Sequence, residues 1–472
     1  MPLRVCCFVF FVLLWPGFSL NAVSQQADTT EKQLFFVIKN VVITGNKTTR
    51  PNIIFRELVF HANDTIASRN LDVALEQSKK NLLNTSLFNF VTIDTNKTDS
   101  SAIEVIIDVI ERWYIWPMPF FQLSERNFNV WWENKDFSKA DYGMFLTWDN
   151  FRGRKETLKF LLKMGFDETY GLSYKIPYIN KQKKLGLSFT AMFTGNHEVS
   201  YLTEHNKQVF YKDKEKYTQQ NYYADIGITL RNNIFVSHIF QLNYDHYLFS
   251  DTLLALNSGF APASIMNFFT FYYQFRFDQR DVKAYPLHGL YYNLEFVKHG
   301  LGILRSENFD HSKLHTSLRK YWKIGHRMFM AGGINARLIW GADKPYFTES
   351  GLGFGNDFVR SYEYYVVPGQ HYMVLKLNFK YELIPTRIKK INFIPTKKFN
   401  TLFYALYFNI FTDAGYVKNN LTGAFNDLSN TTLIGSGIGL DFVTYYDKVL
   451  RAEFSVNRRG EYGFFLHFIA PI

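Results

Sequence analysis

The stretch that decides the fold is MVLKLNFKYEL, residues 373–383, in which apolar side chains recur at every second position. Lys376, Asn378, Lys380 and Glu382 lie between them. Successive side chains of a β-strand point to opposite faces, so the pattern predicts a strand with one apolar and one largely polar face. Its length is that of a tilted strand that crosses a bilayer, about nine to eleven residues.

The same alternation recurs from about residue 113 to the end of the chain. It is clear in segments 157–166, 170–178, 185–193, 450–456 and 462–468. At roughly 20 to 24 residues for each strand and its connection, this span holds about 16 strands. An open sheet edge is not viable in lipid, so the sheet must close on itself. We therefore expect residues 113–472 to form an antiparallel transmembrane β-barrel of about 16 strands.

Residues 34–112 have a different pattern and predict a small α/β domain of order βααββ. A first strand ends at the turn Gly45-Asn46, and Pro51 stands where a helix favours proline. Ser68 or Asn70 is expected to cap a second helix. Two alternating segments, from about Phe88 and from about Ile103, predict the remaining strands. The fold class is therefore mixed, with this domain followed by the barrel.

The N-terminal stretch has the pattern of a secretory signal peptide. Arg4 precedes an apolar run over residues 5–14, and small residues follow around Ala22 and Ser24. We expect a signal peptide over 1–24 and a polar tether over 25–33. Both cysteines, Cys6 and Cys7, lie in this segment. The mature chain is therefore expected to have no disulfide, no thiolate metal site and no cysteine nucleophile.

The composition excludes several other classes of protein. Aromatic residues make up 18% of the chain and charged residues 20%, and no apolar run after the N-terminus reaches the length of a spanning helix. The net charge is +11, but the basic residues are scattered rather than gathered in a stripe. Nucleic-acid binding is therefore not expected. No Gly-x-Ser-x-Gly or His-Glu-x-x-His motif occurs, so we expect no enzyme, no metal site and no cofactor.

Motifs along the whole chain after the signal peptide resemble one known superfamily. The N-terminal unit resembles a POTRA domain in its Gly45-Asn46 turn, in Ile53-x-x-Arg56-Glu57-Leu58 and in Leu87-Phe88-x-x-Val91. Further on, four residues resemble the Val-Arg-Gly-Tyr/Phe loop of the BamA-like outer-membrane insertase and two-partner-secretion superfamily. They are Val359, Arg360, Ser361 and Tyr362.

Two later motifs strengthen this resemblance. Phe411-x-Asp413-x-Gly415 is similar to the strand motif Phe-x-Asp-x-Gly of that superfamily, and Gly437-x-Gly439-Leu440 precedes the last strands. Ser361 is a departure, because the superfamily usually has glycine there. If that glycine serves a positive φ or close backbone packing, serine requires a local adjustment.

The resemblance implies that the loop folds back into the barrel, where Arg360 meets Asp413 on the inner wall. A guanidinium matches a carboxylate through two parallel hydrogen bonds, which gives direction as well as charge. In a wet lumen such a pair adds little stability, so its expected use is to hold the loop in position. The alternative is that Arg360 is a solvated loop residue.

The barrel is expected to close between a first strand near residues 142–148 and a last strand near residues 462–468. Bare main-chain groups in lipid cost several kcal/mol each, so we expect a short or distorted seam at which client strands pair as it opens. Glycines in both strands are expected to weaken it. The residues assigned to the seam are Tyr142, Gly143, Gly463, Phe464 and Phe468.

These features favour a factor that inserts proteins into the bacterial outer membrane, with the POTRA-like domain in the periplasm. Its expected partners are unfolded outer-membrane protein clients, outer-membrane lipid, and accessory lipoproteins or periplasmic chaperones. The domain's sheet edge could accept extended client peptides, or the domain could be a spacer. Two alternatives keep the fold. One is an exporter of the two-partner type, although such exporters usually have two POTRA units and a plug helix. The other is a passive pore.

Overall fold

The computed structural model describes residues 35–468, apart from 100, 124–139, 166, 181, 306, 308, 342–344, 391–400, 421–424 and 445–447. The expected signal peptide over 1–24 and tether over 25–33 therefore lie outside the described residues.

The N-terminal domain contains β1 (Phe35–Thr44), α1 (Pro51–Phe55), β2 (Thr65–Ala67), α2 (Ser68–Leu83), β3 (Phe88–Asp99) and β4 (Ala102–Glu111). Its sheet has the order β2-β1-β4-β3, with β1 parallel to β4. Apolar side chains of α2, such as Leu71 and Leu82, are buried against sheet residues such as Ile38, Val105 and Ile107.

Two details of this domain correct the sequence prediction. The order is βαβαββ rather than βααββ, because β2 has only three residues, too few to show an alternation. The predicted cap of α2 is also wrong. The helix begins at Ser68 directly after β2, so Ala67 occupies the N-cap position and makes no side-chain cap bond.

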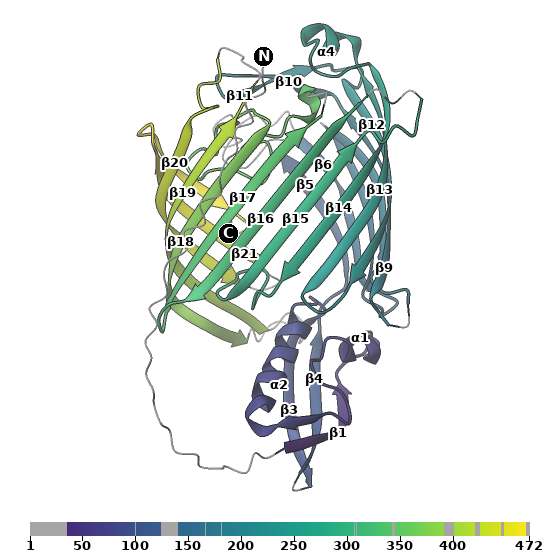
Figure 1. Ribbon diagram of the computed structural model, residues 1–472, viewed down its shortest axis with the longest axis vertical. Helices are drawn as coiled ribbons and strands as arrows, with labels where there is room; N and C mark the ends of the chain where they lie inside the picture. The colour runs from purple at the N-terminus through teal and green to yellow at the C-terminus, as the bar shows by residue number, and fades with distance from the viewer. Residues whose placement is uncertain are drawn as a thin grey trace, which may run out of the picture.

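The rest of the chain forms one 16-stranded antiparallel sheet rolled into a barrel, as Figure 1 shows. This confirms the predicted strand count and fold class. The strands follow one another in sequence order, except that a hairpin is inserted between β9 and β12. They are β5 (Ile115–Leu123), β6 (Ala140–Phe151), β7 (Glu156–Gly165), β8 (Asp167–Ile176), β9 (Leu185–Asn196), β12 (Gln219–Arg231), β13 (Val236–Phe249), β14 (Ile265–Asp278), β15 (Gly289–His299), β16 (His311–Lys323), β17 (Met328–Trp340), β18 (His371–Lys390), β19 (Thr401–Lys418), β20 (Thr432–Thr444), β21 (Lys448–Asn457) and β22 (Tyr462–His467).

The barrel wall is apolar outside and polar inside. In β18, Met373 and Leu377 are 49% and 50% exposed on the outer face. On the inner face of the same strand, Lys376 and Lys380 are buried. A water-soluble protein has the opposite arrangement, so this wall is built for contact with lipid around a polar lumen.

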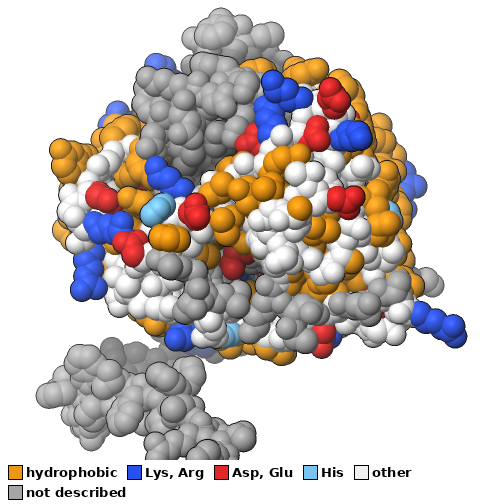
Figure 2. All heavy atoms as spheres, turned by 90° about the horizontal axis from the view of Figure 1, so that it is seen from above, with side chains coloured by type: hydrophobic (Ala, Val, Ile, Leu, Met, Phe, Trp, Pro, Cys, Tyr) orange, Lys and Arg blue, Asp and Glu red, His pale blue; other side chains and the backbone are white. Residues whose placement is uncertain are grey.

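The two ends of the barrel differ. The far end, away from the N-terminal domain, has the hairpin β10 (Glu198–Glu204) and β11 (Lys207–Lys212), helix α4 (Asp251–Leu256) and the short helix η1 (Tyr346–Thr348) (Figure 1). Aromatic residues such as Phe249, Phe260 and Phe347 pack together there. Figure 2 views this end from above, and the described acidic and basic side chains visible there are interspersed. None of the described helices has the length and hydropathy needed to cross a membrane.

The near end of the barrel contacts the N-terminal domain. Arg231, at the end of β12, binds Glu57 through two hydrogen bonds of 2.9 and 3.0 Å. The guanidinium of Arg56 lies 3.4 Å from the ring centroid of Tyr178, and the amide of Arg50 donates to the carbonyl of Gly153. Burial alone would raise the pKa of Glu57, but the positive charges of Lys155 and Arg231 outweigh it and lower this pKa to about 2.

Candidate functional site

The loop between β17 and β18 turns into the barrel, and its arginine meets the inner wall as the motif resemblance implied. Arg360 Nε donates to Asp413 Oδ2 at 2.8 Å and its terminal nitrogen to Oδ1 at 2.5 Å. Both side chains are fully buried. The guanidinium also lies 3.8 Å from the ring centroid of Phe411. Asp413 and Phe411 are both on β19, so one strand supplies the ion pair and the ring.

Two glycines of the wall let the loop backbone approach closely. A Cβ on Gly415 would lie 2.4 Å from Val359, and a Cβ on Gly435 would lie 1.9 Å from the carbonyl oxygen of Arg360. Any side chain at either position would therefore displace the loop. Val359 and Tyr362 are buried on either side of the arginine. The loop motif and the β19 motif thus form one packed unit.

Ser361 adopts a backbone conformation that favours glycine. Its φ is 75°, in the left-handed region that a side chain disfavours. Its hydroxyl is buried and has no hydrogen-bond partner in the described structure. Ser361 therefore holds a positive φ at an energetic cost.

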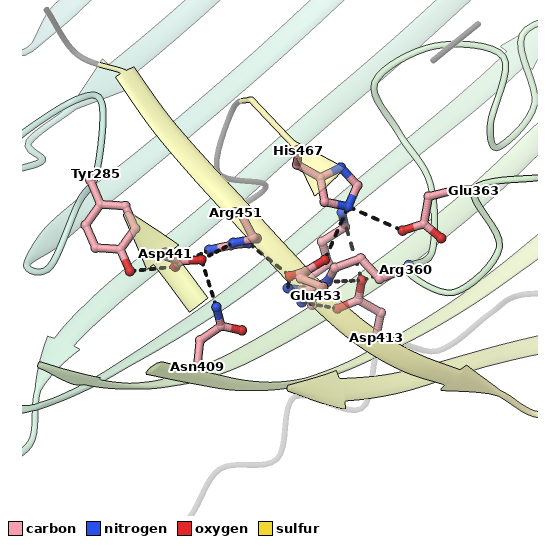
Figure 3. A network of polar contacts seen from close by, with 10 residues as sticks. Tyr285, Arg360, Glu363, Asn409, Asp413, Asp441, Arg451, Glu453 and His467 are labelled. Atoms are coloured by element: carbon pink, nitrogen blue, oxygen red, sulfur yellow. Dashed lines mark hydrogen bonds and ion pairs between the residues drawn. The ribbon is translucent and has the colours of Figure 1, made fainter. Parts of the chain in front are cut away.

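A second buried ion pair lies beside the first. Arg451 on β21 binds both oxygens of Asp441 on β20, at 2.5 and 2.7 Å. Glu453 Oε1 lies 3.4 Å from Arg360 and 3.5 Å from Arg451, and so connects the two pairs (Figure 3). Removing one partner of such a pair leaves a buried charge uncompensated, so the network fixes the loop against three strands.

The turn between β14 and β15 extends this network to the near end of the lumen. Tyr285 is buried and donates from its hydroxyl to Asp441 at 2.7 Å (Figure 3). Its ring packs against Tyr407 of β19, and Lys380 of β18 lies over it. Asn84 of the N-terminal domain donates to the carbonyl of Asp281 in the same turn. The turn therefore lies between the N-terminal domain and the charged network.

The sequence analysis did not select Arg451, Glu453, Asp441 or Tyr285. A signal for the first two was present, because Arg451 and Glu453 occupy the polar positions of an alternating segment. No sequence pattern marks Tyr285, because its role depends on which strands lie near the turn after folding.

The predicted location of the seam was partly wrong. The first wall strand is β5, not the strand at Tyr142 and Gly143. Those two residues are on β6, inside the sheet, where Gly143 pairs with Phe120 and Lys163. The prediction missed β5 because prolines interrupt its strand pattern. The other edge was placed correctly: Gly463 and Phe464 are on β22, and Phe468 follows the end of that strand.

The free edge of β5 lacks two of its hydrogen-bond donors. The amide of Asp149 donates to the carbonyl of Tyr114, and residues alternate between facing β6 and facing away. The main-chain N–H and C=O groups of Trp116, Met118 and Phe120 therefore face β6. Pro117 and Pro119, which have no N–H, face the open edge, where prolines in sheets are tolerated. In the described part of the chain, no strand register joins β5 to β22.

The fold and the inner loop define a class of protein: an outer-membrane-type 16-stranded barrel whose lumen is occupied by a loop locked through an arginine. Solved structures with a similar fold include the following two. BamA from Haemophilus ducreyi lacking POTRA domains 1–3 matches with a TM-score of 0.50 and 15% identity, over 90% of this chain and 81% of that one. CdiB from Escherichia coli matches with a TM-score of 0.51 and 11% identity, over 96% and 91%. These matches confirm the expected fold. No protein-family model and no curated protein matches the sequence.

Proposed function

We propose that this protein inserts polypeptides into the bacterial outer membrane through the seam between β5 and β22, with its POTRA-like N-terminal domain in the periplasm. The observation that carries this proposal is the edge of β5. Pro117 and Pro119 remove two consecutive donors from its free side. A hydrogen bond contributes about 1 kcal/mol net in water, and an unmade one costs several times more in lipid. These two donors are therefore missing from any pairing that β5 makes with β22.

The contents of the lumen favour insertion over a passive pore. The buried loop carrying Arg360 and the turn carrying Tyr285 both occupy the interior of the barrel. A wide aqueous channel would require both to move. A weak seam, by contrast, gives a client strand access to the wall while the two ion pairs keep the rest of the barrel in shape.

Export of a dedicated partner is the second candidate, because the CdiB structure matches about as well as the BamA structure. An exporter moves its substrate along the lumen and has no need of a weak seam. The proline edge is the feature that favours insertion in this proposal. We expect clients to be unfolded outer-membrane proteins that arrive with the help of chaperones or accessory lipoproteins, and we expect no enzymatic activity.

The proposal is tested by depleting the protein from cells and quantifying other β-barrel proteins in the outer membrane. Depletion should lower their amounts, and the unaltered protein should restore them. A Pro117→Val, Pro119→Val variant regains the two N–H donors and should hold the seam closed more firmly. It should therefore restore the amounts of the other barrel proteins only incompletely. Met118→Val is the matched control, because its amide already faces β6. Barrel amounts that do not change on depletion would exclude the insertion role.

A further inference from the structure

Three side chains of metal-ligand type meet in the lumen next to the arginine network (Figure 3). They are Glu363 on the loop, Glu453 on β21 and His467 on β22, and their ligand atoms all lie within 4.8 Å of one another. Glu363 and Glu453 are 4% and 1% exposed. The sequence analysis expected no metal site, because the three residues are far apart in the chain and form no motif.

Both carboxylates face the same nitrogen of the histidine. His467 Nε2 lies 3.3 Å from Glu453 Oε2 and 3.6 Å from Glu363 Oε1. A ring nitrogen carries either one hydrogen or one lone pair, so a single N–H can point at only one of these oxygens. Within the described structure, neither His467 Nε2 nor Glu453 Oε2 makes a hydrogen bond of accepted geometry. A cation bound by these two atoms, with Glu363 as a third ligand, would satisfy both.

The separations also have the size that a small metal ion requires. Bonds from zinc to nitrogen and carboxylate oxygen are roughly 2.0 to 2.2 Å, which places the ligand atoms of a tetrahedral site roughly 3.3 to 3.6 Å apart. The two distances from His467 Nε2 fall in this range. The two carboxylate oxygens lie within 4.8 Å of each other, so the histidine is already at metal-ligand distance from both and the carboxylates can approach to complete the site.

A second luminal histidine provides the contrast. His315 also lies between two carboxylates, but Nδ1 faces Glu295 at 3.8 Å and Nε2 faces Asp357 at 3.0 Å. There each carboxylate faces its own ring nitrogen, although Nε2 of His315 also makes no hydrogen bond of accepted geometry within the described structure. Flanking acids alone therefore do not distinguish a metal site, whereas convergence on one nitrogen does.

Glu453 belongs both to the arginine network and to this cluster. Arg360, Arg451 and Lys376 contact the carboxylates of Asp413, Asp441 and Glu453. Glu453 turns Oε1 toward the arginines and Oε2 toward His467, and so serves both sites.

We propose that Glu363, Glu453 and His467 bind one divalent transition-metal ion, with water completing its coordination. One imidazole and two carboxylates suit Zn²⁺ or Mn²⁺ better than Ca²⁺, which takes six to eight oxygen ligands. The ion joins the inner loop to the last two strands, and so holds β22 to the structure inside the barrel. This inference does not depend on the insertion role.

The test uses the full mature chain, purified in detergent, treated with EDTA and desalted. Calorimetric titration with ZnCl₂ and MnCl₂ should show one ion per chain for at least one of the two metals, with CaCl₂ binding more weakly. Elemental analysis after gel filtration should give the same stoichiometry. His467→Gln should weaken binding at least tenfold, and His315→Gln should leave it unchanged.

Two results would overturn the site: no stoichiometric binding of either metal to the unaltered protein, or equal binding by His467→Gln. Far-UV circular dichroism and heat-modifiable gel mobility identify variants that fail to fold. If His467→Gln fails to fold, Glu363→Gln replaces it, because this substitution changes the loop and leaves the wall intact. The site then stands only if Glu363→Gln also loses metal affinity.

Discussion

Arg360, on the loop inside the barrel, and Asp413, on the wall strand β19, form a fully buried pair joined by two side-chain hydrogen bonds. The amide of Arg360 also donates to Asp413, at 3.2 Å. Three bonds from one residue to one carboxylate specify both the position and the orientation of the loop. Breaking this pair is therefore expected to have a large effect on the barrel.

Arg360→Ala leaves the Asp413 charge buried without its partner, which costs roughly 3 to 5 kcal/mol for pairs of this kind. Arg360→Lys keeps the charge but not the two-bonded geometry, so its effect should be intermediate. Urea unfolding in detergent measures both free energies. Arg458→Ala removes an exposed arginine and should change the free energy by less than 1 kcal/mol. Equal effects of Arg360→Ala and Arg458→Ala would mean that the pair does not hold the loop.

Ser361→Gly should stabilise the barrel by about 1 kcal/mol, since glycine adopts a φ of 75° without the cost that a Cβ imposes. Ser361→Ala is the matched control. It also removes the buried hydroxyl but keeps the Cβ, so it should not reproduce the gain. The same urea unfolding measurement separates the two variants, and a gain for alanine equal to that for glycine would assign the effect to the hydroxyl.

The contact between the N-terminal domain and the barrel should weaken in acid. Because the pKa of Glu57 is lowered from 4.5 to about 2, its contribution is complete above about 4.5 and is lost as the pH falls toward 2. Energy transfer between fluorophores on the domain and on the barrel should report the separation. Glu57→Gln should already separate the two at neutral pH. Glu76→Gln, on the exposed face of α2, should behave as the unaltered protein does.

Tyr285→Ala should increase ion conductance through the barrel in planar bilayers, because it removes the ring that packs against Tyr407 across the near end of the lumen. Tyr285→Phe keeps the ring and loses only the bond to Asp441, so its conductance should stay near that of the unaltered protein. An unchanged conductance for the alanine variant would show that this turn does not restrict the lumen.

The barrel and its arginine motif were predictable, while the network around the motif was not. Alternation in segments such as 373–383 fixes which face of a strand meets lipid, since that pattern is local. Arg360 and Asp413 were paired through the resemblance of two motifs. The convergence of Glu363, Glu453 and His467 depends on where a long loop lies within the barrel, which no local pattern encodes.

The first wall strand escaped prediction for a different physical reason. Pro117 and Pro119 argue against a central strand, and the sequence alone does not reveal that β5 is an edge strand where proline is allowed. The prolines that hid this strand are therefore also the residues that remove N–H donors from its outer edge. Similarly, β2 was missed because three residues are too short to show a period.

The most direct test of the account is a disulfide across the seam, made from cysteines placed at Ile115 or Phe121 of β5 and Tyr462 or Phe464 of β22. Both natural cysteines lie in the N-terminal ten residues, so the rest of the chain offers a clean background. Insertion of a client barrel into proteoliposomes should stop when the disulfide forms and recover on reduction, while a cysteine pair joining β21 to β20 should have no effect. Undiminished insertion with the seam fully cross-linked would contradict the account.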